Sequence, residues 1–270
     1  MSADSHPVAP VRVQVDPDGL AVVTVDHPPL NLFDEALHTA LLDAVGELEH
    51  TAPRATLFRA EGRVVSGGVD VRDVFHPLAV AGDTDGGTRC FDELVELGER
   101  VDRLPFPTVF AAHGLTLTWA FELALACDLI LASPRASFGL IEATVGLTPA
   151  MGGTQRLAQR VGAGRAKLFV MTAGRFGAEE MERWGAIDRL LPDEGFDAAA
   201  RAFAATLAAG PTRAHAATKE ILRHWTAGGV DEANRETPRI AGDLFATEDL
   251  RGAMASFVEQ GHGKATFDGR

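Results

Sequence analysis

The sequence predicts an α/β core followed by a C-terminal region made of helices. Between about residues 11 and 192, short apolar segments typical of strands alternate with longer segments that have helical spacing. Such alternation is usual where helices cover a sheet. After about Pro192 the strand-like segments end, and the chain has helical character as far as about residue 260. We therefore expect a loose tail over residues 1–10, a mixed core over 11–192 and a helical region over 193–270.

The first elements of the core are expected to be a hairpin, a helix and a strand. Residues 11–15 alternate between apolar and polar, Asp16-Pro-Asp-Gly19 is typical of a turn, and residues 20–25 supply the second strand. Over residues 37–48 the apolar positions recur at i, i+3, i+4 and i+7, which is the spacing of one helical face. A further strand is expected at 55–59.

The middle of the core continues this alternation without a repeat of fixed length. We expect a helix over residues 91–104, a strand over 108–112, a short helix from about Trp119 and a strand over 128–132. Residues 72–89 contain a proline and several glycines, so they are expected to form a mobile loop. Such a loop is either a tolerated surface insertion or a lid over a binding site.

Composition argues against several classes of protein. A formal charge of −13 disfavours nucleic acid and anionic membranes as partners, because these are held largely through Lys and Arg contacts to phosphate. No segment has the roughly 20 apolar residues needed to span a membrane, and no signal-peptide pattern is visible. The two cysteines, Cys90 and Cys127, have neither metal-ligand spacing nor a disulfide framework. We expect a cytoplasmic protein that binds neither nucleic acid nor membrane.

Two glutamates stand alone in apolar segments. Glu122 is the single charge in residues 119–127, and Glu142 is the single charge in residues 138–147. Burial raises the pKa of a carboxyl group, which suits it to proton transfer near neutral pH. If the two side chains converge on one pocket, one can act as a base while the other donates a proton. The alternative is a buried glutamate that backbone groups or an arginine satisfy.

Two glycine pairs allow backbone N–H groups to approach a ligand, although a tight turn is the commoner reason for such a pair. Ser66-Gly-Gly-Val-Asp70 follows an extended segment, and Gly152-Gly-Thr-Gln-Arg156 opens a helix. The chain has no P-loop, no His-x-x-x-His spacing and no Gly-x-Ser-x-Gly motif, which argues against nucleotide triphosphate, metal and serine-hydrolase chemistry. His113 follows a predicted strand and is expected to be structural.

Taken together, these segments resemble the crotonase, or enoyl-CoA hydratase/isomerase, family over residues 11–270. The stretches most specific to the family, in matching order and spacing, are residues 66–70, 122–128, 138–142 and 152–157, followed by 179–185, 218–220 and 248–251. The resemblance implies a crotonase-like spiral of ββα repeats with a C-terminal helical trimerisation region. It also implies a homotrimer or a dimer of trimers.

The resemblance further implies a site for an acyl-CoA thioester. The family's acid/base pair matches Glu122 and Glu142, and its two oxyanion-hole donors match the backbone N–H groups of Val69 and Trp119. Residues that match the family's contacts with coenzyme A are Arg63, Gly68, Arg72 and Phe257. Neither a metal nor a separate cofactor is implied, because coenzyme A is part of the substrate.

The implied reaction is hydration of a trans-2-enoyl-CoA to a 3-hydroxyacyl-CoA, with Glu122 activating water and Glu142 exchanging the proton at the α-carbon. The alternatives are another crotonase-type reaction (isomerase, hydrolase or decarboxylase) or a catalytically silent acyl-CoA-binding paralogue. The silent alternative arises because Thr118-Trp119-Ala120 stands where the family commonly has glycines. We expect the Trp119 indole to lie beside the thioester and to narrow the acyl pocket. His113 stands where the family commonly has an asparagine.

Overall fold

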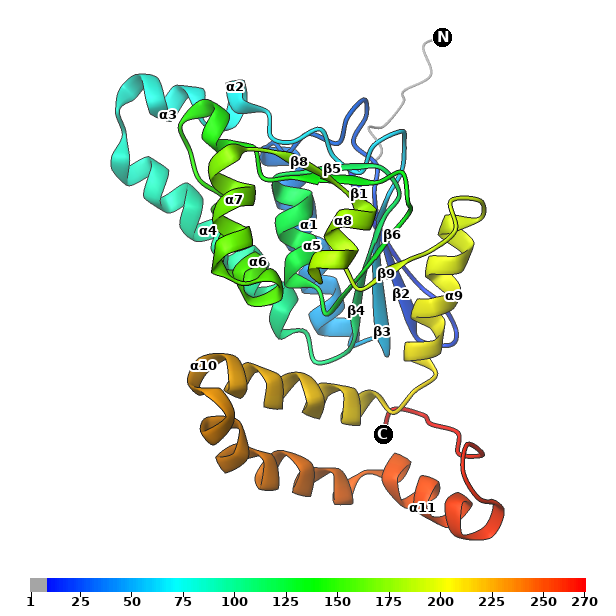
Figure 1. The fold of residues 1–270 in the computed structure, drawn as a ribbon. Coiled ribbons are helices and arrows are strands. Elements are labelled where there is room, and N and C mark those ends of the chain that lie inside the picture. The colour runs from blue at the N-terminus through cyan, green and yellow to red at the C-terminus, as the bar shows by residue number, and fades with distance from the viewer. Residues whose placement is uncertain (1–8) are drawn as a thin grey trace.

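A twisted six-stranded sheet forms the centre of the protein (Figure 1), whose fold is taken from a computed structural model that describes residues 9–270. Most of the tail expected over residues 1–10 lies outside the described residues. The strands follow the order β1-β2-β3-β4-β6-β9, and every neighbouring pair is parallel except β1 and β2. The bounds are β1 Val11–Val15, β2 Leu20–Val25, β3 Ala55–Ala60, β4 Thr108–Ala112, β6 Leu129–Ala132 and β9 Arg189–Leu190.

Both faces of this sheet are buried, which explains why its strands are almost continuously apolar. In β2, Val23 belongs to the core on one face and Val22 to the core on the other, because successive side chains of a strand alternate between faces. Helices α1 (Glu35–Thr51), α4 (Thr84–Arg103) and α5 (Trp119–Ala126) cover the first face, and α9 (Phe196–Ala208) covers the second. The hairpin, the first helix and the three further strands that the sequence predicts are confirmed.

A second, three-stranded sheet was not predicted from the sequence. It contains β5 (Leu115–Leu117), β7 (Ser137–Gly139) and β8 (Arg175–Gly177). These strands are only three residues long, too short for an apolar period to be recognised. The remaining elements of the core are η1 Glu142–Val145, α6 Gly153–Val161, α7 Ala163–Thr172 and α8 Ala178–Trp184.

The prediction of a mobile loop over residues 72–89 is wrong, because this segment is largely helical. It contains α2 (Val71–Val74), α3 (His76–Ala81) and the first turns of α4. The predicted helix over 91–104 therefore begins at Thr84. The side chain of Asp83 accepts a hydrogen bond from Gly86 N at 2.9 Å, and this cap allows glycines to occupy the first turn of α4.

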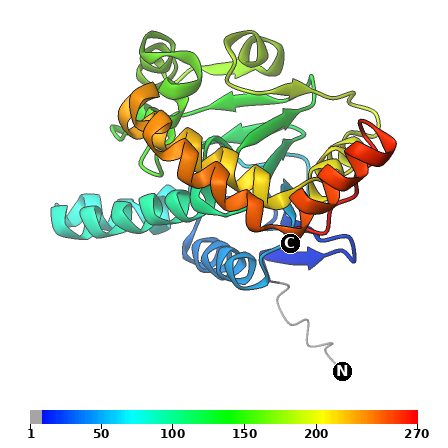
Figure 2. The same ribbon diagram turned by 90° about the horizontal axis from the view of Figure 1, so that it is seen from below.

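The C-terminal helices that lie away from the sheet begin at Thr212. Helix α10 (Thr212–Asp243) is kinked at Gly228 and Gly229, and η2 (Leu244–Ala246) and α11 (Glu248–Gln260) follow. Figures 1 and 2 show α10 and α11 lying across one end of the core. Helix α9 packs on the sheet, so by its packing it belongs to the core, although it lies beyond the boundary predicted at residue 192.

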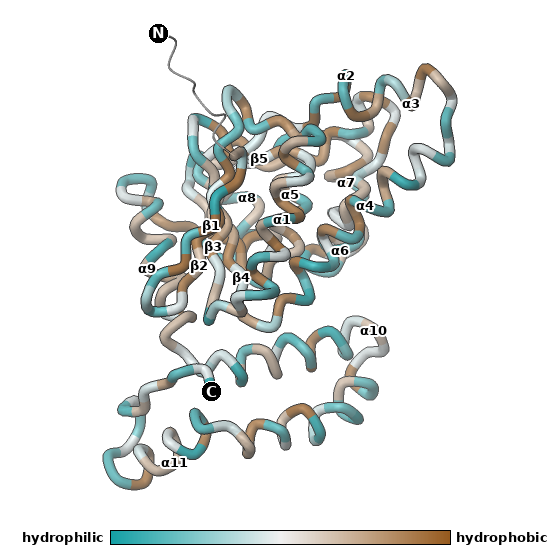
Figure 3. The backbone as a smooth tube through the Cα atoms, turned by 180° about the vertical axis from the view of Figure 1, so that it is seen from behind, coloured by the Kyte–Doolittle hydropathy of each residue, from teal (hydrophilic) through white to brown (hydrophobic). Residues whose placement is uncertain are grey.

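Hydrophobic and hydrophilic positions are interspersed along α10 and α11 (Figure 3). Several large apolar side chains of α10, η2 and α11 are exposed. They are Leu222, Trp225, Val230, Phe245, Met254, Phe257 and Val258. An exposed apolar surface of this kind is typical of a protein interface. The oligomeric role of residues 193–270 stays a prediction.

Candidate active site

Glu122 lies inside the core, held by backbone groups from the start of α6. Its side chain is on α5, whose eight residues are all buried, and Glu122 itself is 4% exposed. Oε2 accepts hydrogen bonds from the backbone N–H groups of Met151 and Gly153, each at 2.8 Å. A Cβ at residue 153 would lie 2.6 Å from Glu122 Cγ, so only glycine fits there. The glycine pair Gly152-Gly153 therefore allows the backbone to approach the side chain of Glu122, not an external ligand.

The pKa of Glu122 is raised by burial, and several groups oppose that increase. The N–H groups of Gly153, Met151 and Ala150 favour the ionised carboxylate, and so does the positive charge of Arg156. Glu122 thus combines a desolvated position with specific stabilisation of its negative form.

Glu142 begins the short helix η1 and has a different environment. Its Oε2 atom is buried, and within residues 9–270 it has no hydrogen-bond partner. Burial, followed by repulsion from the charge of Glu122, raises the pKa of Glu142 to about 8. Because the charge of Glu122 contributes to this increase, the two carboxyl groups lie within electrostatic range of each other. Their action together in one pocket stays a prediction.

The two predicted oxyanion-hole donors lie on adjoining segments. Phe33 pairs with Val69 through bonds to the flanking residues, from Phe33 N to Gly68 O at 3.0 Å and from Asp70 N to Phe33 O at 2.8 Å. The N–H of Val69 therefore points away from Phe33. Trp119 is the first residue of α5, where an N–H group has no intrahelical acceptor.

Gly68 and Thr118, the residues that precede the two donors, are in contact range. A Cβ at residue 68 would lie 3.6 Å from Thr118 Oγ1. Gly68 has a φ of +116° and Thr118 a φ of +48°, so both backbone turns depart from ordinary strand or helix geometry at this point. The two segments that precede Val69 and Trp119 therefore lie against each other, and their role as an oxyanion hole stays a prediction.

The Trp119 side chain is not where the sequence analysis expects it. The indole is buried, with the residue 3% exposed, and its Nε1 donates a hydrogen bond to Asn31 O at 3.2 Å. It packs against Phe33, with 6.0 Å between ring centroids. The expectation of a ring beside the thioester is corrected: the side chain turns into the core because it finds there both an acceptor and an aromatic partner.

An apolar cavity of about 370 Å³ is bounded by α2, α3, the start of α4 and two residues shortly after Glu142 in the chain, with Val71, Phe75, Leu78, Phe91, Val145 and Leu147 among its lining. Neither Glu122, Glu142 nor Trp119 is part of this lining. The segment predicted to be a loop or lid thus forms the helical wall of an apolar cavity.

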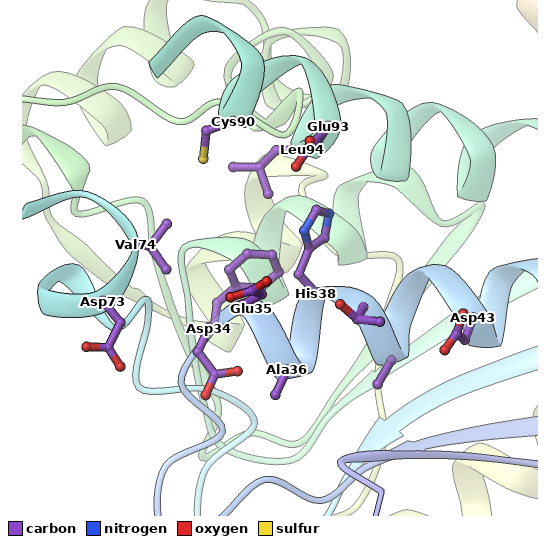
Figure 4. Close-up of a pocket in the computed structure, with 13 residues that line it drawn as sticks. Asp34, Glu35, Ala36, His38, Asp43, Asp73, Val74, Cys90, Glu93 and Leu94 are labelled. Carbon is purple, nitrogen blue, oxygen red and sulfur yellow. The ribbon is translucent and has the colours of Figure 1, made fainter. Parts of the chain in front are cut away.

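A second cavity, of about 860 Å³, lies between α1 and α4 and has a different character (Figure 4). His38 on α1 and Cys90 and Glu93 on α4 face it, together with Asp34 and Asp73. None of the predicted site residues lines it. Its acidic lining makes it unsuited to a phosphate-bearing ligand.

The residues predicted to contact coenzyme A are divided between two regions. Arg63 and Arg72 are exposed near the oxyanion segments, and neither side chain forms an ion pair within the described part of the chain. Gly68, which lies between these two arginines in the sequence, is buried. Phe257 is 59% exposed on α11, at the opposite end of the molecule from α2 (Figure 1). One chain does not bring Phe257 to the other three residues.

Sequence reasoning missed Asn31, which organises the loop before the Val69 segment. Its Nδ2 donates to three carbonyl oxygens, those of Glu61, Val64 and Val65, at 3.0 to 3.2 Å, and its φ is +51°. Asparagine is among the few non-glycine residues that readily adopt positive φ, so its place two residues after a proline pair was a usable signal.

His113 has the structural role that the sequence analysis gives it. It is buried, its Nε2 lies 3.0 Å from Gly62 O, and burial lowers its pKa. Across residues 9–270, no three His, Cys, Asp or Glu side chains are grouped so as to bind a metal ion. In that same range, no helix combines the length and the apolar character that crossing a membrane requires.

The topology and the paired acids define a protein with a crotonase fold. The chain belongs to the enoyl-CoA hydratase/isomerase family, whose model matches residues 16–270. A relative named "Probable enoyl-CoA hydratase" from Rhodobacter capsulatus is 31% identical over 93% of this chain and 95% of its own length. "Short-chain-enoyl-CoA hydratase" from Clostridium acetobutylicum is 28% identical over 89% and 92% of the two chains.

Solved structures give the same assignment. A protein from Streptomyces coelicolor A3(2) that carries an enoyl-CoA hydratase designation superposes with a TM-score of 0.89 at 31% identity, and the match covers all of both chains. An enoyl-CoA hydratase from Bacillus anthracis superposes with a TM-score of 0.87 over 97% of this chain and all of its own. Its identity of 23% makes that second match one of fold alone.

Proposed function

We propose that this protein hydrates a trans-2-enoyl-CoA to the corresponding 3-hydroxyacyl-CoA. The observation that carries the proposal is the buried Glu122 together with the half-buried Glu142, whose pKa the negative charge of Glu122 helps to raise. Two N–H bonds to Glu122 favour its carboxylate form, whereas a pKa of about 8 keeps Glu142 largely protonated at neutral pH. One base and one acid are then available together.

In the proposed reaction Glu122 accepts a proton from water while the water oxygen forms a bond to C3 of the enoyl group. Glu142 gives its proton to C2, so that the C2–C3 double bond becomes a single bond and one molecule of water is added. The proton taken up by Glu122 is returned to Glu142 through solvent, which restores both groups. Negative charge that develops on the thioester oxygen is stabilised by the N–H groups of Val69 and Trp119.

The surroundings of the two glutamates support an acyl-CoA as the substrate. The apolar cavity of about 370 Å³, whose lining includes Val145 and Leu147 shortly after Glu142 in the chain, suits the acyl chain. Arg63 and Arg72 offer exposed guanidinium groups for the phosphates of coenzyme A on a protein that is otherwise strongly acidic. Gly68 leaves room for the ligand to approach the backbone. The scheme uses neither a metal nor a separate cofactor.

We further propose a homotrimer or a dimer of trimers, located in the cytoplasm and without nucleic-acid or membrane partners. The exposed apolar side chains of α10 and α11 supply a surface for subunit contact. Phe257 would then reach coenzyme A held by a neighbouring copy. The net charge of −13 supports the exclusion of polyanionic partners.

The decisive experiment follows the enoyl absorbance of crotonyl-CoA and of longer trans-2-enoyl-CoAs after addition of the protein, with products separated by chromatography. Hydration predicts loss of that absorbance and appearance of the 3-hydroxyacyl-CoA. Saturable binding with unchanged absorbance would instead identify a silent acyl-CoA binder. A product with a moved double bond would identify an isomerase.

A further inference from the structure

We propose that the Trp119 side chain is a positioning residue that fixes the two oxyanion-hole donors relative to each other. Trp119 supplies one donor through its backbone N–H. Its indole connects the same residue to the segment that carries the other donor, Val69. This inference rests on the proposed function, because it concerns how the thioester oxygen would be held.

A chain of three buried hydrogen bonds makes the connection. Trp119 Nε1 donates to Asn31 O at 3.2 Å, Ser66 Oγ donates to the same oxygen at 3.2 Å, and Gly68 N donates to Ser66 Oγ at 2.9 Å. Gly68 directly precedes Val69. Trp119 and Asn31 are each 3% exposed and Ser66 is fully buried, so water does not compete for these bonds.

The middle of this chain is itself immobilised. The Asn31 side chain binds the carbonyl groups of the loop that leads to Ser66, and its Oδ1 accepts from His27 N at 2.7 Å. A second route runs through Phe33, which packs on the indole and pairs with Val69 in an isolated β-bridge. Two independent routes therefore join the ring of one donor residue to the backbone of the other.

Local structure at the start of α5 explains why the contacts of the Trp119 indole with Asn31 and Phe33 matter. Helix α5 has no side-chain cap, and the hydroxyl of Thr118, the residue at the cap position, has no hydrogen-bond partner in the described part of the chain. Thr118 also holds a φ of +48°, a conformation that is costly for a β-branched residue. Backbone bonds join Thr118 N to Gly139 O and Glu122 N to Thr118 O, each at 2.9 Å, and the indole contacts add the link from Trp119 to the segment that carries Val69. A displacement of about 1 Å in a catalytic group can cost roughly a hundredfold in rate.

The test compares Trp119→Phe, which keeps an aromatic ring but loses the N–H donor, with Ser66→Ala, which breaks the chain at another bond. Trp184→Phe is the matched control, since Trp184 lies on α8 outside the site. Two experiments are made. The first measures kcat and KM on crotonyl-CoA. The second measures the infrared frequency of the carbonyl band of bound butyryl-CoA labelled with ¹³C at the thioester carbon. A well-aligned oxyanion hole polarises the carbonyl group and lowers the frequency of this band.

We expect Trp119→Phe and Ser66→Ala each to lower kcat by roughly ten- to a hundredfold, with KM changed by less than about threefold. The lowering of the carbonyl frequency should shrink in both variants and remain in Trp184→Phe. Because the two residues act through one chain, the double variant should be little worse than the more affected single variant.

If Trp119→Phe and Ser66→Ala keep the kcat of the parent and the same lowered carbonyl frequency as the parent, the positioning role of the indole is wrong, while the proposed hydration stands. If Trp119→Phe does not fold, Ser66→Ala decides the question by the same two readouts. If the parent protein itself produces no lowering of the carbonyl frequency and no turnover, the proposed function fails, whatever the role of the indole.

Discussion

The carboxylate of Glu122 lies against the backbone of Gly153, with Oε2 2.8 Å from the Gly153 nitrogen and no space for a Cβ between them. Glycine is thus required at the first residue of α6, because the backbone there approaches the glutamate so closely. A helix N-terminus, which could bind an external anion, here binds an internal one. The position of the candidate base consequently depends on a residue that has no side chain.

Gly153→Ala should therefore displace Glu122 and abolish most hydration. The added Cβ would lie 2.6 Å from Glu122 Cγ, so the glutamate must move and lose its N–H bonds. We expect a fall in kcat of about a hundredfold. Gly164→Ala, in α7 where nothing lies within 4 Å of the added carbon, is the matched control and should leave the rate unchanged. Equal rates in both variants would contradict this account of Gly153.

The raised pKa of Glu142 should make stability depend on pH in a defined direction. The ordinary pKa of an exposed glutamate is 4.5 and burial raises the pKa of Glu142 to about 8, so at pH values between these two the folded state holds a proton that the unfolded state has released. Stability contributed by this group is then fully present below about pH 4.5 and is lost as pH rises through about 8. Melting temperatures of the parent and of Glu142→Gln, measured from pH 4.5 to 8.5, should diverge as pH increases, with the variant more stable at the alkaline end.

Hydration should show a matching alkaline limb. If Glu142 donates the proton to C2, kcat should decline as pH rises through about 8, because the acid form is then depleted. A pH–rate profile on crotonyl-CoA measures this directly. A rate that keeps rising beyond pH 9 would be inconsistent with Glu142 as the proton donor.

Lys219 joins α10 to the core through a partly buried ion pair. Its Nζ donates to Asp128 Oδ2 at 2.8 Å and to Phe106 O at 3.1 Å. Lys219→Met should destabilise the protein by about 1–3 kcal/mol, less than the loss of a fully buried pair, because Asp128 still accepts from Thr108. Lys167→Met, at an exposed site on α7, should change stability by less than about 0.5 kcal/mol. Denaturant unfolding of the two variants measures the difference.

Assembly through α10 and α11 predicts a mass that is a multiple of three chains in light scattering. Large apolar side chains of α10, α11 and the η2 turn between them, including Phe245 at 76% exposure and Val258 at 84%, need a partner surface. Removal of residues 211–270 should make the protein insoluble, because it also exposes the core surface that α10 covers. A stable species of 28.6 kDa at micromolar concentration would contradict the trimer.

The sequence predicted the central strands and the two glutamates because their signals are local. A lone acid such as Glu122 in an apolar helix is visible at once, and so is the near-continuous apolar character of a doubly covered strand. The direction of the Trp119 indole was not predictable, since it depends on Asn31, which lies 88 positions away in the chain. Residues 72–89 were misassigned because glycine and proline usually interrupt helices, whereas here Pro77 lies in the first turn of α3 and Asp83 caps α4, which has glycines in its first turn.

Glu142 and Glu122 should act on one substrate in different roles, and glutamine substitutions separate these roles. Glu142→Gln preserves size but removes the transferable proton, so hydration should fall by about two to four orders of magnitude while acyl-CoA binding changes far less. Glu122→Gln should also depress hydration. Exchange of the α-proton of a saturated acyl-CoA in deuterated water should depend mainly on Glu142, because that step needs no attacking water. The charge of Glu122 helps to raise the pKa of Glu142, so Glu122→Gln should lower that pKa. The decline of exchange at alkaline pH should then begin at a lower pH. Substitutions that leave both hydration and exchange at parental rates would rule out the two-glutamate mechanism on this fold.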